Sequence, residues 1–216
     1  MTSFVPKVDP EWLGPFLSYC HTKQYDKRVD FIRAGEPAET LYYLVEGSVA
    51  ALMEDEEHRE LTLAYIHKGE FIGEMGLFLP QKARSVIVRT RERCRVAEIS
   101  YKRLEQLLER ELRDHALGIL QAIGQQLALR LRHTSRKVGD LAFLDVTGRI
   151  AGTLLELCKH PDAMTHPDGM QIRITRQDLG RIVGCSREMA GRVLKALEEQ
   201  DHIGVKGKTI VVFGAR

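Results

Sequence analysis

The feature that most constrains the fold is a run of residues, mostly apolar, at alternating spacings of three and four. The run comprises Leu117, Leu120, Gly124, Leu127, Leu131, Thr134, Val138 and Leu141. This heptad spacing predicts a long helix, at about residues 113–141, that pairs with a second helix in a coiled coil. The alternative is an amphipathic helix packed on its own domain, for which a 3.6-residue period and a wider apolar stripe are typical. The coiled coil predicts a homodimer.

Residues 26–99, before this helix, have the pattern of a compact antiparallel β structure. Short apolar and β-branched runs alternate with turn residues, and these runs are LYYLV, SVAALM, LTLAYI, SVIVRT and RVAEIS. Short strands at regular spacing favour a barrel or roll. A short helix through Trp12 and Phe16 is expected before the strands. No long helical pattern interrupts the strands, so a doubly wound parallel sheet is disfavoured.

Residues 142–216 predict a second, smaller domain. A helix over residues 142–160 leads into a loop with a turn at Asp168-Gly169, followed by the strand QIRI. Two short helices then flank a glycine-containing turn, and the tail IGVKGKTIVVFGAR has the pattern of a hairpin. This order is typical of a winged helix-turn-helix. The fold class is therefore α+β, with domains at 1–141 and 142–216.

The caps of the two short helices support this assignment. Thr175 and Asp178 form a capping-box pattern before the first helix, with Asp in place of the usual Glu. Gly184 ends that helix, and Ser186 is placed to cap the second. In a helix-turn-helix the second helix enters the major groove of DNA.

A local basic face supports DNA binding, although the whole chain carries a formal charge of only +2. The stretch from Arg173 to Lys195 holds six basic and two acidic residues, a net charge of +4. The predicted DNA-binding residues are Arg176, Ser186, Arg187, Glu188, Arg192 and Lys195. Arginine suits the two acceptors of guanine, and glutamate can accept from cytosine N4. Because phosphates repel a carboxylate, Glu188 is better placed as a base reader, and the alternative is a Glu188–Arg192 surface pair.

A second group of candidate functional residues lies in FIGEMGLFLPQKARSVIV, within the predicted strand region. Glycines such as Gly73 let backbone N–H groups approach a phosphate, and Arg84 supplies a charged planar fork. Glu74 can accept a hydrogen bond from a sugar hydroxyl, and Ser85 follows Arg84 directly. The pattern fits a phosphorylated ribose. The alternative is a turn glycine with a Glu74–Arg84 salt bridge.

Thr134 is the polar break in the heptad run, and Ser135 lies beside it. A hydroxyl in an apolar seam is costly unless it finds a partner. Thr134 can bond its own helix backbone. Alternatively, it can reach a base held between the barrel and the paired helices, which would couple ligand binding to helix pairing.

Taken together, these motifs resemble the Crp/Fnr family of transcriptional regulators. The resemblance spans residues 21–216 and is densest in ETLYYLVEGSVA, FIGEMGLF, ARSV, TSRKVGDLAFLDVTGRIA, PDAMTHPDGMQIRITRQ, IVGCSRE and KGKTIVVFG. It implies a homodimer with a cyclic-nucleotide β-roll, a long dimerisation helix and a winged helix. It also implies cAMP as the allosteric effector, with double-stranded DNA and RNA polymerase as partners.

The resemblance assigns roles to individual positions. For cAMP, Gly73, Glu74, Arg84 and Ser85 would hold the ribose and cyclic phosphate. Thr134, together with Ser135 of the partner subunit, would approach the adenine. In DNA binding, Arg187, Glu188 and Arg192 would read bases, supported by Arg176. The loop 162–170 would touch RNA polymerase through Thr165, His166, Asp168 and Gly169. A second polymerase contact would lie at His21 and Lys23.

Some stretches depart from the cAMP pattern. GEMG and VRTRERC are closer to a branch of the family in which cyclic di-GMP opposes DNA binding. Arg84-Ser85 and Thr134-Ser135 keep the cAMP pattern and favour cAMP. The alternatives that remain open are a regulator inhibited by cyclic di-GMP and a regulator independent of any ligand.

Other classes are disfavoured. A cyclic-nucleotide phosphodiesterase needs metal ligands or a base near the phosphate, and none of the eight histidines lies between residues 74 and 85. The four cysteines form no CxxC pair, so neither a zinc site nor any other metal is expected. No apolar run reaches the roughly 18–20 residues of a membrane span. The start lacks the features of a signal peptide, so a cytoplasmic protein is expected. Because neither metal ligands nor a base is evident near the phosphate, no enzymatic activity is expected.

Overall fold

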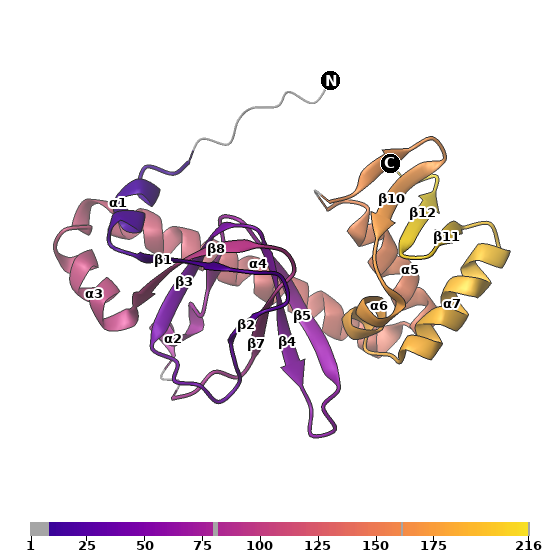
Figure 1. The fold of residues 1–216 in the computed structure, drawn as a ribbon, viewed down its shortest axis with the longest axis horizontal. Helices are drawn as coiled ribbons and strands as arrows, with labels where there is room; N and C mark the ends of the chain where they lie inside the picture. Colours follow the sequence, from indigo (N-terminus) through magenta and orange to yellow (C-terminus); the bar gives the residue numbers. More distant parts are fainter. Residues whose placement is uncertain (1–8, 80–81, 161, 216) are drawn as a thin grey trace. The chain divides into compact units, whose positions relative to one another are not determined.

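The computed structural model describes residues 9–79, 82–160 and 162–215 and divides the chain into two compact units (Figure 1). The N-terminal unit comprises residues 1–52 and 64–132, and the C-terminal unit comprises residues 53–63 and 133–216. The predicted boundary between residues 141 and 142 stays a prediction. The expectation of no signal peptide concerns the start of the chain, whose first eight residues lie outside the described ranges.

The strands between residues 21 and 100 form two four-stranded antiparallel sheets, which belong to the N-terminal unit except for residues 53–54 and 60–63. One has the order β1-β8-β3-β6 (His21–Tyr25, Cys94–Ser100, Thr40–Glu46, Phe71–Ile72), and the other has the order β2-β7-β4-β5 (Asp30–Ile32, Ile87–Thr90, Ser48–Glu54, Glu60–His67). The five strands predicted from apolar runs are all confirmed, as is the β-roll. The sequence missed β1, because HTKQY is polar and mostly exposed and so lacks the alternation that marks a half-buried strand.

Short helices close this unit. They are α1 (Leu13–Ser18), α2 (Met75–Phe78) and α3 (Tyr101–Glu109), followed by a 3-10 turn at Arg113–His115. The predicted N-terminal helix is confirmed as α1. The Trp12 ring stacks on the Phe71 ring with their centroids 5.7 Å apart. Phe16 and Tyr43 pack edge-on against the Phe71 ring. This aromatic cluster fixes Trp12 and α1 on the sheet that carries β6.

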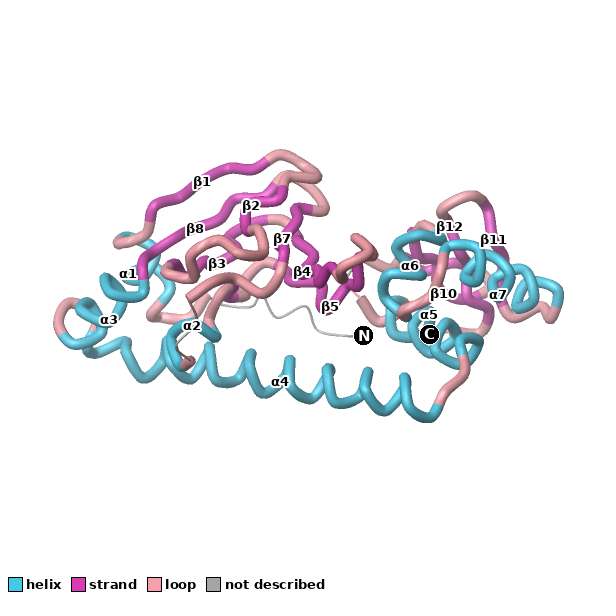
Figure 2. Tube along the Cα trace, turned by 90° about the horizontal axis from the view of Figure 1, so that it is seen from below, coloured by secondary structure: helices cyan, strands magenta, loops and turns pink. Residues whose placement is uncertain are grey.

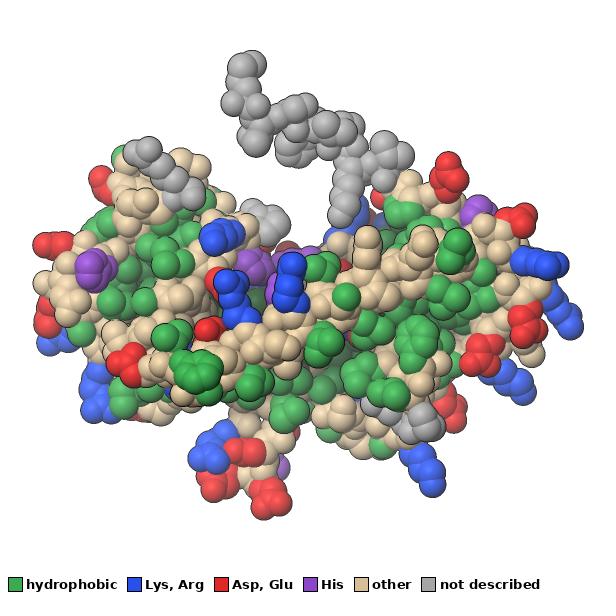
Figure 3. Space-filling model, turned by 180° about the vertical axis from the view of Figure 1, so that it is seen from behind, with side chains coloured by type: hydrophobic (Ala, Val, Ile, Leu, Met, Phe, Trp, Pro, Cys, Tyr) green, Lys and Arg blue, Asp and Glu red, His purple; other side chains and the backbone are tan. Residues whose placement is uncertain are grey.

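The predicted long helix is confirmed as α4 (Ala116–Phe143), a continuous helix of 28 residues (Figure 2). Its inner face is buried at Ile119, Ile123 and Gln126. Its outer face carries the predicted heptad run, in which Leu117, Leu131, Val138 and Leu141 are 68%, 69%, 60% and 55% exposed. Figure 3 shows apolar side chains exposed on the side of the molecule opposite to the view in Figure 1. The helix therefore has two apolar faces, and the part of the chain that the structure describes covers only one of them.

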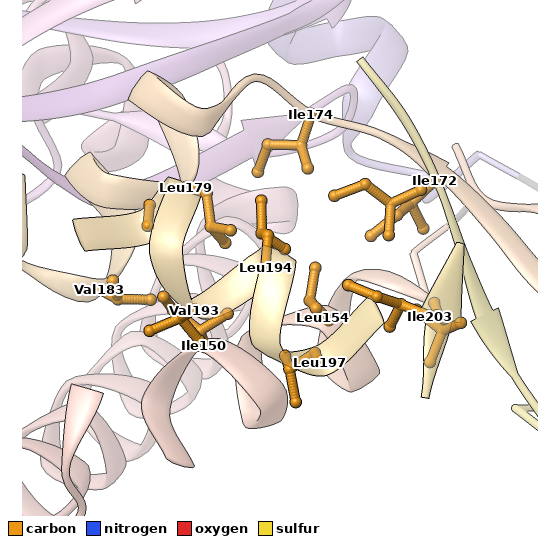
Figure 4. Packing of buried hydrophobic residues seen from close by; sticks show 14 residues of the cluster. Ile150, Leu154, Ile172, Ile174, Leu179, Val183, Val193, Leu194, Leu197 and Ile203 are labelled. Carbon is orange, nitrogen blue, oxygen red and sulfur yellow. The ribbon is translucent and has the colours of Figure 1, made fainter. Parts of the chain in front are cut away.

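The C-terminal unit contains the predicted winged helix-turn-helix. The helices are α5 (Val146–Leu157), α6 (Arg176–Val183) and α7 (Arg187–Glu199), and the sheet has the order β11-β12-β10-β9 (Ile203–Lys206, Thr209–Phe213, Gly169–Arg173, Met164–His166). Apolar side chains from the helices and strands meet in one core (Figure 4). The segment expected to be a loop before Gly169 is instead half of a β-hairpin, because Met164–His166 pair with β10 and move the turn to residues 167–168.

The predicted caps define the ends of α6 and the start of α7. The Thr175 hydroxyl accepts the Asp178 N–H at 3.0 Å, and the Ser186 hydroxyl accepts the Met189 N–H at 3.1 Å. Gly184 ends α6 with φ of 70°, the left-handed conformation that glycine adopts without strain. These three residues confirm the helix boundaries that the sequence predicted.

Candidate functional site

The most unusual charge in the N-terminal unit is the guanidinium of Arg84. Arg84 is only 8% exposed, and the structure records no carboxylate in ion-pair contact with it among the described residues. Its Nη1 donates to the Tyr101 hydroxyl at 3.0 Å, and its Nη2 donates to the Thr40 carbonyl. Because a buried cation with only neutral partners is costly, this arrangement suits an anionic ligand that supplies the missing charge.

Two glycines make room for this group. Gly73 has φ of 83°, and a Cβ there would lie 2.5 Å from Arg84 Nη1. A Cβ at Gly76 would lie 2.4 Å from the Tyr101 hydroxyl oxygen. Real Cβ atoms do not approach other atoms so closely. Glycine at both positions therefore leaves room for the Arg84–Tyr101 pair, a reason that differs from the predicted approach of backbone N–H groups to a phosphate.

Glu74 lies beside these glycines and is 3% exposed. Its Oε1 accepts from Arg130 Nη1 at 2.6 Å, and Arg130 Nη2 donates to the Phe71 carbonyl at 2.9 Å. The alternative of a Glu74–Arg84 salt bridge is not what the structure has, since Glu74 pairs with Arg130 of α4. A carboxylate held in this way keeps lone pairs for a hydroxyl donor such as a sugar.

The structure gathers three of the predicted ligand residues, Gly73, Glu74 and Arg84, in the N-terminal unit. Ser85 is exposed and follows Arg84 directly. Thr134 and Ser135 are exposed on the part of α4 that belongs to the C-terminal unit. The ligand roles of all six residues stay predictions.

The sequence analysis missed Arg130, Tyr101 and Gln126, although they organise this site. Gln126 clamps β6, because its Oε1 accepts the Phe71 N–H at 2.7 Å and its Nε2 donates to the Phe71 carbonyl at 2.8 Å. The signal for Arg130 was present: it continues the inner stripe of α4 at the helical spacing after Gln126. No comparable sequence signal marks Tyr101.

The candidate DNA-reading residues are exposed at the start of α7. Arg187, Glu188 and Arg192 are all exposed, and the structure records no ion pair between Glu188 and Arg192, the alternative considered above. Ser186 is engaged as the cap of α7. Arg176 lies across Gly191 of α7, with its Cδ 3.5 Å from where a Cβ would be. This contact brings Arg176 alongside the second helix of the motif.

Two other basic residues of this face are paired with carboxylates. Arg181 Nη2 lies 2.8 Å from Glu60 Oε2, within the same unit, and Lys195 Nζ lies 3.6 Å from Glu199 Oε1. Fewer basic side chains are therefore available to a partner than the six counted from the sequence. The remaining basic face is centred on Arg176, Arg187 and Arg192.

The predicted polymerase-contact residues lie on the β9–β10 hairpin. Thr165 pairs with Met170 and His166 with Gly169, and the Asp168 N–H donates to His166 Nδ1 at 3.3 Å. His21 and Lys23 lie on β1, where Lys23 is ion-paired with Glu98 at 2.6 Å. Contacts of these residues with polymerase stay predictions.

Two further features concern metal binding and membrane crossing. Among residues 9–79, 82–160 and 162–215, no group of three or more His, Cys, Asp or Glu side chains is arranged to hold a metal ion. In the same ranges, each helix is too short or too polar to cross a bilayer.

A β-roll with a buried, unpaired arginine and a winged helix-turn-helix with exposed basic side chains define a class: DNA-binding transcriptional regulators with a sensor domain. Comparison with known families agrees. The cyclic nucleotide-binding domain family matches residues 22–111, and the Crp-like helix-turn-helix domain family matches residues 148–213.

Individual relatives define the family more closely. The chain is 57% identical to the cAMP-activated global transcriptional regulator CRP of Salmonella typhimurium, over 98% of both chains. It is 53% identical to the CRP-like protein Clp of Xanthomonas euvesicatoria, over 97% of this chain and 91% of that one. The solved structure of CLP from Xanthomonas campestris, described as a c-di-GMP responsive global regulator, matches with a TM-score of 0.91 and 52% identity, over 94% of this chain and 98% of that one. The chain belongs to the CRP family of transcriptional regulators, which are not enzymes.

Proposed function

We propose that the protein is a cAMP-gated regulator, in which cAMP binds the β-roll and α4 and so enables binding to a palindromic DNA site. The observation that carries the proposal is the burial of Arg84 without a carboxylate partner among the described residues. A cyclic phosphate brings one negative charge and planar oxygen pairs that match the guanidinium fork. Glu74 is placed to accept a ribose hydroxyl, and Ser85 is exposed next to Arg84. The relatives named as cAMP-activated support this ligand.

The apolar outer face of α4 supports a homodimer. Leu117 and Leu131 are more than two-thirds exposed on a helix whose inner face is already covered. Pairing this face with its copy would form the coiled coil that the heptad spacing predicts. Thr134, together with Ser135 of the partner subunit, would then lie near the adenine. In such a dimer the two recognition helices would read half-sites about 34 Å apart.

Gating requires that cAMP bind the DNA-competent arrangement more tightly than the other arrangement. The link between α4 and α5 is the candidate hinge. α4 ends at Phe143, and Asp145 caps α5 by accepting the Gly148 N–H at 2.7 Å. Only Leu144 and Asp145 separate the two helices, so a small backbone change there would redirect α5 and the residues that follow it.

We assign DNA base contacts to Arg187, Glu188 and Arg192, and phosphate contacts to Arg176 and, more weakly, Lys195. Ser186 would support base reading from the helix cap. The exposed tip of the β9–β10 hairpin would contact RNA polymerase in the cytoplasm, through Thr165, His166, Asp168 and Gly169.

A second candidate is a regulator whose DNA binding is inhibited by cyclic di-GMP. It is favoured by the likeness to CLP, whose structure is described as c-di-GMP responsive. The two functions differ in the direction of the response: cAMP would tighten DNA binding, whereas cyclic di-GMP would weaken binding that is already tight without ligand.

The deciding experiment measures binding of the full chain to a TGTGA-N6-TCACA duplex by fluorescence anisotropy. The titration is run with no nucleotide, cAMP, cyclic GMP and cyclic di-GMP at one fixed salt concentration, since salt alone shifts such affinities by orders of magnitude. Tightening by cAMP, lost in Arg84→Gln and reduced in Thr134→Ala, supports the proposal. Tight binding without ligand that cyclic di-GMP weakens favours the second candidate, and binding indifferent to all nucleotides contradicts both.

A further inference from the structure

The hydroxyl of Tyr101 lies at the centre of a chain of hydrogen bonds that the proposed function leaves unexplained. It donates to the Gly73 carbonyl at 2.5 Å and accepts from Arg84 Nη1 at 3.0 Å. A phenol has only one proton. Because that proton is used on the carbonyl, the lone pair must face Arg84, and the hydroxyl has no proton left for a ligand.

The backbone holds Tyr101 firmly in this place. Ser100 pairs with Thr40 across β8 and β3, and the Tyr101 N–H donates to the Glu39 carbonyl at 2.9 Å. Tyr101 is therefore next to Thr40, whose carbonyl accepts from the other terminal nitrogen of Arg84. Tyr101 and Thr40 thus hold the two ends of one guanidinium.

This two-point support determines which donors remain free. A guanidinium has five N–H groups, and Tyr101 and Thr40 use one on each terminal nitrogen. The remaining donors lie on a fixed plane. Burial raises the pKa of Tyr101 and the adjacent Arg84 charge opposes that rise, so the hydroxyl keeps its proton for Gly73 at neutral pH.

We propose that Tyr101 is a positioning residue of the ligand site: it fixes the plane of the Arg84 guanidinium so that the free N–H groups meet the cyclic phosphate of cAMP. The inference rests on the proposed function for the identity of the ligand. Tyr101 acts through Arg84 and does not touch the nucleotide. Its role also explains why Gly73 and Gly76 lack side chains, since a Cβ at either position would collide with this pair.

The test is a double-mutant cycle between Tyr101→Phe and Arg84→Lys, with cAMP affinity measured by calorimetry and, for weak variants, by competition with a fluorescent cAMP analogue. Lysine keeps the charge but has no plane to orient. With Arg84 present, Tyr101→Phe should weaken binding about tenfold, the effect of losing one hydrogen bond to a charged group. With Arg84→Lys, the same change should alter binding less than twofold. An equal loss in both backgrounds would mean that Tyr101 merely supports the fold, and no loss in either would also overturn the inference.

Tyr42→Phe is the matched control. The Tyr42 ring also lies over Arg84, with the guanidinium carbon 5.7 Å from its centroid, but the structure records no hydrogen bond from Arg84 to its hydroxyl. This variant should keep wild-type affinity. An effect equal to that of Tyr101→Phe would show that losing any hydroxyl near Arg84 weakens binding, and it would contradict the inference.

A second measurement separates this inference from the proposed function. In the ligand-free protein, nitrogen-15 NMR should show slowly rotating terminal nitrogens for Arg84, because both are hydrogen-bonded. Tyr101→Phe should collapse these signals, and Tyr42→Phe should retain them. If the wild type does not bind cAMP, the proposed function fails, while loss of the Arg84 signals in Tyr101→Phe still supports positioning. Signals that survive Tyr101→Phe overturn it.

Discussion

Gln126→Leu should destabilise the N-terminal unit through a single backbone group. Gln126 is only 9% exposed, and its amide bonds both the N–H and the carbonyl of Phe71. Leucine fills a similar volume but leaves the buried N–H without this acceptor. The Phe71 carbonyl keeps its 2.9 Å hydrogen bond from Arg130, so the substitution leaves only the Phe71 N–H without its partner.

The expected loss follows from that count. One buried, unsatisfied N–H costs about 1–3 kcal/mol, so we expect the free energy of unfolding to fall by about 2 kcal/mol. With a urea m-value of roughly 1–3 kcal/mol per molar, the unfolding midpoint should move by about 1 M. The shift should be read at one protein concentration, because dimerisation would add to apparent stability.

The assay has a natural probe. Trp12 is the single tryptophan of the chain, and it stacks on Phe71 at 5.7 Å. Its fluorescence during urea unfolding therefore reports on the perturbed site. Gln125→Leu is the control, since Gln125 is the exposed neighbour on the same helix. Equal midpoints for the two variants, or unchanged hydrogen exchange at the Phe71 amide, would refute the argument.

Three further outcomes are expected. Leu131→Lys, on the outer face of α4, should halve the mass seen in sedimentation, whereas Leu129→Lys, exposed on another face, should not; a dimer in both would contradict the seam. Gly184→Ala should cost about 1 kcal/mol in thermal unfolding, because φ of 70° strains any Cβ, although a Cβ would meet Leu61 and Leu141 only at ordinary contact distances of 3.9 and 4.0 Å; no loss would show that the turn relaxes. Burial raises the pKa of Cys20 from 9.0 to about 12. Its alkylation by iodoacetamide at pH 8 should therefore be about a thousandfold slower than that of a free thiol, because the thiolate is the reactive form. Mass spectrometry measures the rate, and a rate equal to that of a free thiol would contradict this.

The fold was largely predictable, because its elements depend on local patterns. The heptad run identified α4, and Thr175, Gly184 and Ser186 marked the helix-turn-helix to within a residue. The alternation of apolar and polar residues fails to predict a strand whose side chains do not alternate between buried and exposed positions. β1 is polar along its length and is held by its partner β8 rather than by an apolar face, so only the register of the sheet reveals it.

The site was predictable only in part. Residue types drew attention to Glu74 and Arg84, since a carboxylate and a guanidinium near glycines suit a phosphorylated ribose. Their partners come from tertiary structure. Arg130 reaches Glu74 because α4 packs its inner face on β6, and Tyr101 reaches Arg84 because β8 ends beside Thr40. No spacing along the chain encodes either contact.

The placement of these partners suggests how ligand binding and helix pairing would be linked. Gln126 and Arg130 face the β-roll, while their immediate neighbours Leu127 and Leu131 belong to the predicted seam. An α-helix turns about 100° per residue, so any rotation that repositions Arg130 must also rotate Leu131. A ribose hydroxyl that binds Glu74 would share this carboxylate with Arg130. Under the proposed function, the nucleotide would therefore act on dimer packing through one rigid helix, with no need for a separate relay.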